Sequence, residues 1–188
     1  AMADDGPATG RCLVLVTPDA DRTLNTFLGI SSAIGPDQLQ EDIIAASQYV
    51  YLEGYLFSSD DGFAAAAQAQ KIARRHGTTV SLTLSDPFMV GAFKERFDAI
   101  IDQGVDLLFC NEEEALAYTG ASDREAAGEI LAARSATTYI TCGADGALVY
   151  SNGEKEMVPG VRVEAVDTTG AGDLFAGGAL YGLSYGYN

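Results

Sequence analysis

The sequence predicts an α/β fold in which a largely parallel, doubly wound sheet lies between two layers of helices. Two observations predict it. From about residue 36 onward, short apolar segments of strand length alternate with segments of helical periodicity, a pattern typical of a parallel sheet covered on both faces. Apolar residues make up 47% of the 188 residues, which is enough to form one sizeable core.

A β-hairpin is expected before this alternation begins. Cys12–Val16 and Arg22–Leu28 contain β-branched residues and flank the turn-forming tetrapeptide Pro18–Asp21. We therefore divide the chain into a hairpin unit at residues 1–30 and an α/β core at residues 31–188.

The core is expected to contain helices and strands in alternation. The helices cover Pro36–Ser47, Asp61–Arg75, Pro87–Gln103, Asn111–Tyr118 and Arg124–Arg134. The strands cover Tyr49–Leu52, Thr79–Leu84, Val105–Cys110 and Thr137–Thr141, and a closing hairpin joins Gly146–Tyr150 to Lys155–Val158. The boundaries rest on turn and cap signals, such as Asn152-Gly153 in that hairpin and Asp86 before Pro87 at a helix start.

The composition argues against several classes of partner and site. The chain carries 11 Lys and Arg against 27 Asp and Glu, a formal net charge of −16, so it offers no basic surface to nucleic acid or an anionic membrane. No apolar run reaches the roughly 20 residues of a membrane span, and the N-terminus lacks a signal-peptide pattern. Cys12, Cys110 and Cys142 have no CxxC spacing, which favours reduced cysteines in the cytoplasm over a structural metal site.

The densest chemical signal is Asp167–Gly178, which follows a strand-like stretch at Val161–Val166 and opens an apolar helix. Small residues at Gly170–Gly172 can point successive backbone N–H groups at one anion, which the helix dipole also favours. Asp173 would then lie beside a bound phosphoryl group. From the residues alone, a glycine-rich turn capped by Asp167 or Asp173 is an equally good interpretation.

Two familiar phosphate-binding motifs do not fit this segment. A P-loop needs Lys and then Ser or Thr after its last glycine, whereas Gly177 is followed by Gly178 and Ala179. A dinucleotide-binding fingerprint needs a third glycine where Phe175 stands.

Three motifs together resemble the ribokinase-like carbohydrate kinases, also called the PfkB family. Asp167-Thr-Thr-Gly-Ala-Gly-Asp173, continuing through Phe175-Ala-Gly177, is similar to the C-terminal signature of that family. Asn111-Glu-Glu-Glu114 is similar to its Asn-x-x-Glu motif, and Thr141-Cys-Gly-Ala-Asp-Gly146 to its Thr-x-Gly-x-x-Gly nucleotide loop. The hairpin and Leu84–Pro87 resemble the adenosine-kinase-like bacterial branch.

The resemblance implies a ribokinase-like, three-layer fold with a small β lid, and it implies ATP and Mg²⁺ as cofactors. It makes Asp173 the base that accepts the proton of the attacking hydroxyl, and Gly170, Ala171 and Gly172 the cradle for the developing charge. It makes Glu114 the organiser of Mg²⁺. The implied nucleotide-binding residues are Asn111, Thr141, Gly143, Gly146 and, in the lid, Arg22.

The same residues have structural interpretations when the resemblance is set aside. Asn111 and Glu114 would form a helix cap, Gly143 and Gly146 a hairpin turn, and Arg22 a solvated surface charge.

The implied function is transfer of the ATP γ-phosphate to a primary hydroxyl of a sugar or nucleoside, with adenosine-like substrates favoured by the hairpin. The alternative is a kinase-like nucleotide-binding or assembly module without turnover, which the presence of both Asp173 and Glu114 disfavours. Relatives of this kind have segments before the position of Cys12 and after that of Asn188. We therefore expect an incomplete, internal part of such a kinase, whose exposed sheet edge would admit a homodimer.

Overall fold

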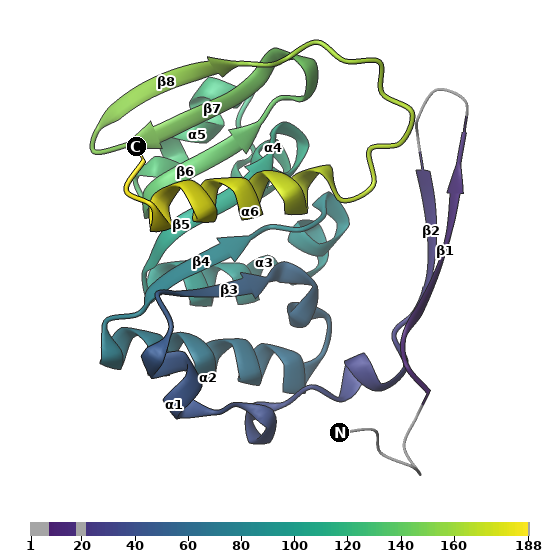
Figure 1. The fold of residues 1–188 in the computed structure, drawn as a ribbon, viewed down its shortest axis with the longest axis vertical. Coiled ribbons are helices and arrows are strands. Elements are labelled where there is room, and N and C mark those ends of the chain that lie inside the picture. Colours follow the sequence, from purple (N-terminus) through teal and green to yellow (C-terminus); the bar gives the residue numbers. More distant parts are fainter. Residues whose placement is uncertain (1–7, 18–21, 188) are drawn as a thin grey trace.

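The computed structural model describes residues 8–17 and 22–187, which form two sheets (Figure 1). The small sheet is an antiparallel hairpin of β1 (Arg11–Val16) and β2 (Arg22–Phe27), which stands beside the large sheet. This is the predicted hairpin. Its predicted turn, Pro18–Asp21, lies outside the described residues.

The large sheet has six strands, and their spatial order follows the chain from β3 to β8. The strands are β3 (Tyr49–Glu53), β4 (Thr79–Thr83), β5 (Val105–Asn111), β6 (Ser135–Thr141), β7 (Gly146–Ser151) and β8 (Glu154–Pro159). Strands β3 to β6 are parallel, whereas β7 and β8 are antiparallel to their neighbours. The predicted parallel core and closing hairpin are both confirmed.

Helices lie on both faces of this sheet and complete the three layers (Figure 1). They are α1 (Glu41–Ala46), α2 (Asp60–His76), α3 (Pro87–Asp102), α4 (Glu112–Thr119), α5 (Arg124–Ala132) and α6 (Ala171–Ser184). Helices α2 to α5 connect the parallel strands and pack on one face, and α1 packs on α2. On the other face, α6 lies across the centre of the sheet (Figure 1).

The main core lies between the sheet and helices α2 to α5. Alternate strand residues point into it, including Val80, Leu82 and Leu108, all of which are fully buried. Aromatic residues fill the space under the helices, where the rings of Phe57 and Phe97 pack edge to face with centroids 4.6 Å apart. This packing anchors β4 and β5, whose carboxyl ends reach the site described below.

The predicted helix over Pro36–Ser47 is wrong in its first half. Residues Pro36–Gln38 form one 3-10 turn, and the helix begins only at Glu41. The Gln38 side chain accepts a hydrogen bond from the Gly35 N–H at 2.6 Å, which closes that turn on itself. The chain is then extended at Leu39, so the turn cannot continue into α1.

The strand-like stretch Val161–Val166 is also not a strand. The chain leaves the sheet after Pro159 and crosses to the start of α6 without regular structure. The side chains of Val161, Val163 and Val166 are about four-fifths exposed, with relative areas of 86%, 79% and 82%. These valines alternate as in a strand, but their side chains do not pack against a neighbouring element of the described chain.

Candidate active site

A cavity of about 790 Å³ opens at the carboxyl ends of the parallel strands, where the start of α6 and strand β2 of the hairpin meet them. Crevices at this edge of parallel sheets are where α/β proteins bind ligands. The lining residues from the strands, the segments that follow them and the starts of α3 and α4 include Glu53, Tyr55, Thr83, Ser85, Met89, Asn111, Glu114 and Thr141. The lining residues from the other two elements include Leu24, Thr26, Thr168, Thr169, Gly170, Ala171, Gly172 and Asp173.

The start of α6 is built by a tight turn that only glycine adopts readily. Gly170 is the N-cap residue in the left-handed region, with φ of 77°, and no side chain caps the helix there. Asp167 instead accepts a hydrogen bond from the Thr169 N–H at 2.8 Å. Neither Asp167 nor Asp173 is therefore the cap residue that the structural interpretation required.

The first turn of α6 lines the cavity with its backbone and one carboxylate, and the N–H of Ala171, which the resemblance makes part of the anion cradle, is already used within the turn. The Ala171 N–H donates to the Thr168 carbonyl at 3.1 Å, and the backbone of Gly170 and Gly172 lies on either side of it. Asp173 is exposed in the same turn and lines the cavity. A helix start of this kind favours an anion beside the Asp173 carboxylate.

Asn111 and Glu114 hold each other at the end of β5. Glu114 accepts from the Asn111 N–H at 3.0 Å and from Asn111 Nδ2 at 2.9 Å, and the Glu114 N–H donates to Asn111 Oδ1 at 2.7 Å. Glu114 is only 6% exposed, and this burial raises its pKa to about 7, although the Asn111 N–H opposes the shift. The pair forms a capping box, as the structural interpretation predicted, and it also lines the cavity. A role for Glu114 in organising Mg²⁺ stays a prediction.

Glu53, which the sequence analysis did not single out, also lines the cavity. It is half-buried at the end of β3 and accepts a hydrogen bond from Ser85 Oγ at 3.3 Å. Burial and the nearby charge of Asp173 raise the pKa of Glu53, and the Ser85 hydrogen bond partly offsets them. Glu53 and Asp173 are therefore neighbouring carboxylates in this site, although they are far apart in the sequence.

The predicted nucleotide loop forms the turn between β6 and β7. Thr141 reaches the cavity, whereas Gly143 and Gly146 lie further along the turn and are not among its lining residues. Gly146 has φ of 111°, and a Cβ there would meet the Val158 carbonyl oxygen at 2.0 Å, so the position requires glycine. Arg22 lies in β2, but its side chain is outside the described part of the structure.

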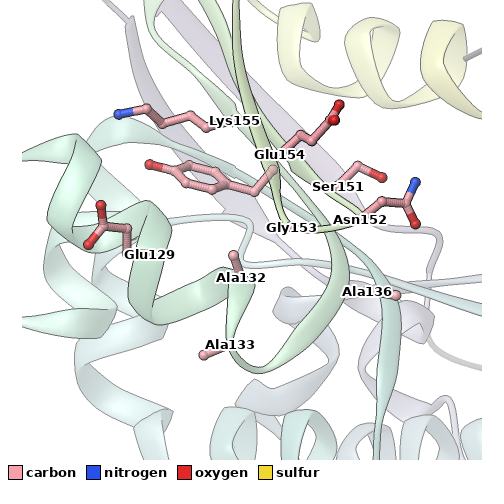
Figure 2. Close-up of a pocket in the computed structure, with 10 residues that line it drawn as sticks. Glu129, Ala132, Ala133, Ala136, Ser151, Asn152, Gly153, Glu154 and Lys155 are labelled. Atoms are coloured by element: carbon pink, nitrogen blue, oxygen red, sulfur yellow. The ribbon is translucent and has the colours of Figure 1, made fainter.

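A second, open hollow of about 440 Å³ lies at the opposite end of the sheet, between the end of α5 and the β7–β8 turn (Figure 2). Glu129, Asn152 and Lys155 are among its lining residues. None of the predicted site residues reaches it. The motif residues therefore converge on the cavity at the carboxyl ends of the strands.

Three further observations concern the described residues. Cys12, Cys110 and Cys142 are free cysteines, the first exposed and the other two buried. Within residues 8–17 and 22–187, no three His, Cys, Asp or Glu side chains are grouped so as to hold a metal ion. None of the helices in this part of the chain has the length and apolar character that crossing a membrane requires.

Comparison with known proteins identifies relatives for the whole chain. Residues 2–188 match the family described as pfkB family carbohydrate kinase. An adenosine kinase of Schizophyllum commune is 30% identical over 208 residues, which cover 98% of this chain and 59% of that protein.

Solved structures agree with this result. The adenosine kinase of Sinorhizobium meliloti superposes with a TM-score of 0.93 at 37% identity, covering 97% of this chain and 56% of that one. A probable sugar kinase of Rhizobium etli superposes with a TM-score of 0.91 at 37% identity, covering 95% of this chain and 55% of that one. The chain thus spans somewhat more than half the length of these relatives.

Proposed function

We propose, starting from the premise that this chain belongs to the pfkB family of carbohydrate kinases, that the whole protein transfers the γ-phosphate of ATP to a primary hydroxyl of a nucleoside or sugar. The observation that carries the proposal is the convergence of Asn111, Glu114 and the start of α6, with Asp173, on one cavity. Phosphoryl transfer needs positioning and local charge neutralisation more than covalent chemistry from the protein. The helix start would supply the positioning, and Mg²⁺ would supply the neutralisation, since the described lining residues include Glu53, Glu114 and Asp173 but no Lys or Arg.

Each element of the cavity then has a task. The first turn of α6 binds the transferring phosphoryl group through its backbone donors. Asp173, in the same turn, would accept the proton of the attacking hydroxyl. Strand β2 of the hairpin lines one side of the cavity through Leu24 and Thr26, and its closing over bound substrates would exclude water from the reaction.

The donor set fits Mg²⁺, which prefers oxygen ligands and usually keeps several waters and substrate phosphates. Glu114 supplies a carboxylate whose orientation Asn111 fixes, and it lines the cavity close to the phosphate-binding turn. When bound, the ion would neutralise phosphate charge that a chain of net charge −16 cannot neutralise elsewhere.

Adenosine-like acceptors are part of the proposal. The supports are the hairpin sequence and the adenosine kinases among the relatives at 30% and 37% identity. A cytoplasmic location, suggested by the free cysteines, and a possible second copy as partner belong to the same proposal. The second candidate function, a nucleotide-binding module without turnover, would keep the phosphate-binding turn but have no use for Asp173.

The test is the Asp173→Asn substitution in the whole protein, assayed for ADP formation with adenosine or ribose as acceptor. Removing a general base lowers kcat by about 10²- to 10⁴-fold, while the backbone donors that bind ATP stay in place. We therefore expect a loss in kcat with an unchanged or slightly lower KM for ATP.

Asp61→Asn is the matched control, because Asp61 is an exposed carboxylate in the first turn of α2, away from the cavity. It should retain the parent rate. A rate within a few-fold of the parent for Asp173→Asn would show that the base lies elsewhere. ATP binding by the parent without transfer to any acceptor would favour the module without turnover.

A further inference from the structure

We propose that Arg124 is a positioning residue, which holds the β6–β7 loop at Gly143–Asp145 in place beside the start of α4 and thereby sets the affinity of the site for the nucleotide. This inference rests on the proposed function, since it takes Thr141, which precedes that loop and lines the cavity, and the Asn111–Glu114 motif as the nucleotide side of the cavity. Arg124 touches no substrate in this view and acts through the loop.

The location of Arg124 is the first observation. It is the first residue of α5, where the helix dipole disfavours a positive charge. The helix start is already capped, because Asp123 accepts a hydrogen bond from the Ala126 N–H at 2.9 Å. Helix stability therefore does not explain a cation at this position, and its contacts outside the helix do.

Those contacts join three separate segments. Arg124 Nη1 donates to Asp145 Oδ2 at 2.8 Å and to Glu112 Oε2 at 3.3 Å. Asp145 is the last residue of the loop, and Glu112 directly follows Asn111 at the start of α4. The Arg124 side chain is 28% exposed, whereas the side chains of Glu112 and Asp145 are 42% and 62% exposed. Solvent therefore screens both contacts, and their effect comes from joining three segments rather than from a strong single ion pair.

On its other side the loop is held by backbone packing. The Gly160 N–H donates to the Asp145 carbonyl at 3.1 Å, and a Cβ at Gly160 would meet the Ala144 carbonyl oxygen at 2.5 Å. The loop therefore lies between the end of β8 and Arg124. Removing Arg124 would release the side that faces α4.

The charges around Arg124 determine in which direction the loop would move once Arg124 is removed. Without the guanidinium, the carboxylates of Asp145 and Glu112 face each other with no cation between them and repel. The loop would move away from α4, and so from the Glu114 carboxylate. Lysine at this position would keep the charge but not the planar group that places its donors, so it should restore the contacts only in part.

The experiment measures the KM for ATP and kcat in the whole protein for Arg124→Gln and Arg124→Lys. We expect Arg124→Gln to raise the KM for ATP about three- to tenfold, the range for loss of a partly exposed, charge-assisted contact, with kcat at saturating ATP changed less than twofold. Arg124→Lys should lie between the parent and Arg124→Gln. Hydrogen exchange at the amides of residues 143–146, without nucleotide, should be faster in Arg124→Gln.

Lys155→Gln is the matched control, because Lys155 pairs with Glu125 of the same helix at 2.8 Å, on the side of the second hollow (Figure 2). It should leave the KM for ATP and the loop amides unchanged. If Arg124→Gln folds poorly, Asp145→Asn removes the same contact without removing a cation from α5, and it should raise the KM for ATP in the same direction.

The possible results separate this inference from the function on which it rests. An unchanged KM for ATP in both Arg124→Gln and Asp145→Asn, with an active parent, would overturn the inference and leave the kinase assignment intact. A drop in kcat with an unchanged KM would also overturn it. A parent that neither binds ATP nor transfers phosphate would overturn the proposed function itself.

Discussion

The two faces of the large sheet differ sharply in how they are covered. On the face packed by α2 to α5, side chains such as Phe97, Leu108 and Ile140 are fully buried. On the other face α6 buries Leu107, Phe109 and Ala176, while Leu174 and Tyr181 of the same helix are 77% and 60% exposed. The cavity lies at the end of this second, thinly covered face. In this chain the densely packed face holds most of the buried core, and the thinly covered face leads to the cavity.

The two faces should differ most in how much a substitution lowers the free energy of unfolding, and the largest loss is expected for a buried aromatic ring. Phe97→Ala should lower the free energy of unfolding by about 3–5 kcal/mol, because the Phe97 side chain is fully buried and packs on Phe57. Leu174→Ala, on the exposed side of α6, should change it by less than about 0.5 kcal/mol. Denaturant unfolding of the 188-residue chain measures both, and equal losses would contradict the difference between the two faces.

Glu114 lies at the boundary of the two faces. Substituting it tests whether its buried carboxylate binds Mg²⁺ or only caps the helix. Glu114→Gln keeps the shape of the capping box but removes the carboxylate, so we expect the Mg²⁺ concentration needed for half-maximal rate to rise about tenfold or more. Glu113→Gln, at an exposed position in the same helical turn, is the control and should not change it. An unchanged Mg²⁺ requirement in Glu114→Gln would make the pair a helix cap only.

The same carboxyl predicts a pH dependence. Its pKa is raised to about 7 from an ordinary value of 4.5, so the folded state binds its proton more tightly than the unfolded state does. This contribution to stability is complete below about pH 4.5 and is lost as the pH rises through 7. Unfolding without Mg²⁺ across this window should show the loss in the parent and not in Glu114→Gln.

The smallest expected effect belongs to the densely packed face. Asp98 of α3 accepts hydrogen bonds from Tyr118 at 2.6 Å and from Arg134 at 2.9 Å, and its pKa is lowered to about 2 by these groups and Lys94, although burial opposes the shift. Stability from Asp98 is therefore present above its unfolded pKa near 3.8 and is lost as the pH falls towards 2.

Because Asp98 is partly exposed, with a side-chain area of 33%, the effect should be about 1 kcal/mol. Asp98→Asn should flatten the stability profile between about pH 4 and pH 2 by that amount. Asp42→Asn, an exposed carboxylate in the first turn of α1, should leave the profile unchanged. Parallel profiles for the parent and Asp98→Asn would show that the cluster adds no acid-sensitive stability.

The alternation of short apolar segments and helical segments was enough to predict the layers and the strand order in the chain. It failed where a side chain or the tertiary structure decides the outcome. Gln38 closes a turn on Gly35, which no periodicity reveals. The valines of 161–166 alternate as in a strand, yet no neighbouring strand or helix covers them.

The residues of the site also fall into some that the sequence indicated and one that it did not. Asn111–Glu114 and Asp167–Asp173 were singled out through the resemblance to the carbohydrate kinases, because from the residues alone a helix cap or a glycine-rich turn explains each motif as well. Both motifs line the cavity, and their roles in binding and catalysis stay predictions. Glu53 could not be predicted, since it is one acidic residue after an apolar strand. Its place in the cavity depends on the strand register, which pairs it with Thr83. Its raised pKa depends in part on the approach of Asp173, which is 120 positions away in the sequence. The position of Glu53 at a parallel strand's carboxyl end was the one available signal.

Helix α6 packs on the sheet and also lines the cavity with its first turn. This combination affects how the chain responds to heating. The contact of α6 with the sheet depends on one buried residue, Ala176, and a few partly buried neighbours, while its first turn carries Asp173. Local opening of this one helix therefore costs less free energy than unfolding of the α2 to α5 face. On heating the 188-residue chain, hydrogen exchange along α6 should therefore rise at a lower temperature than exchange along α2 to α5.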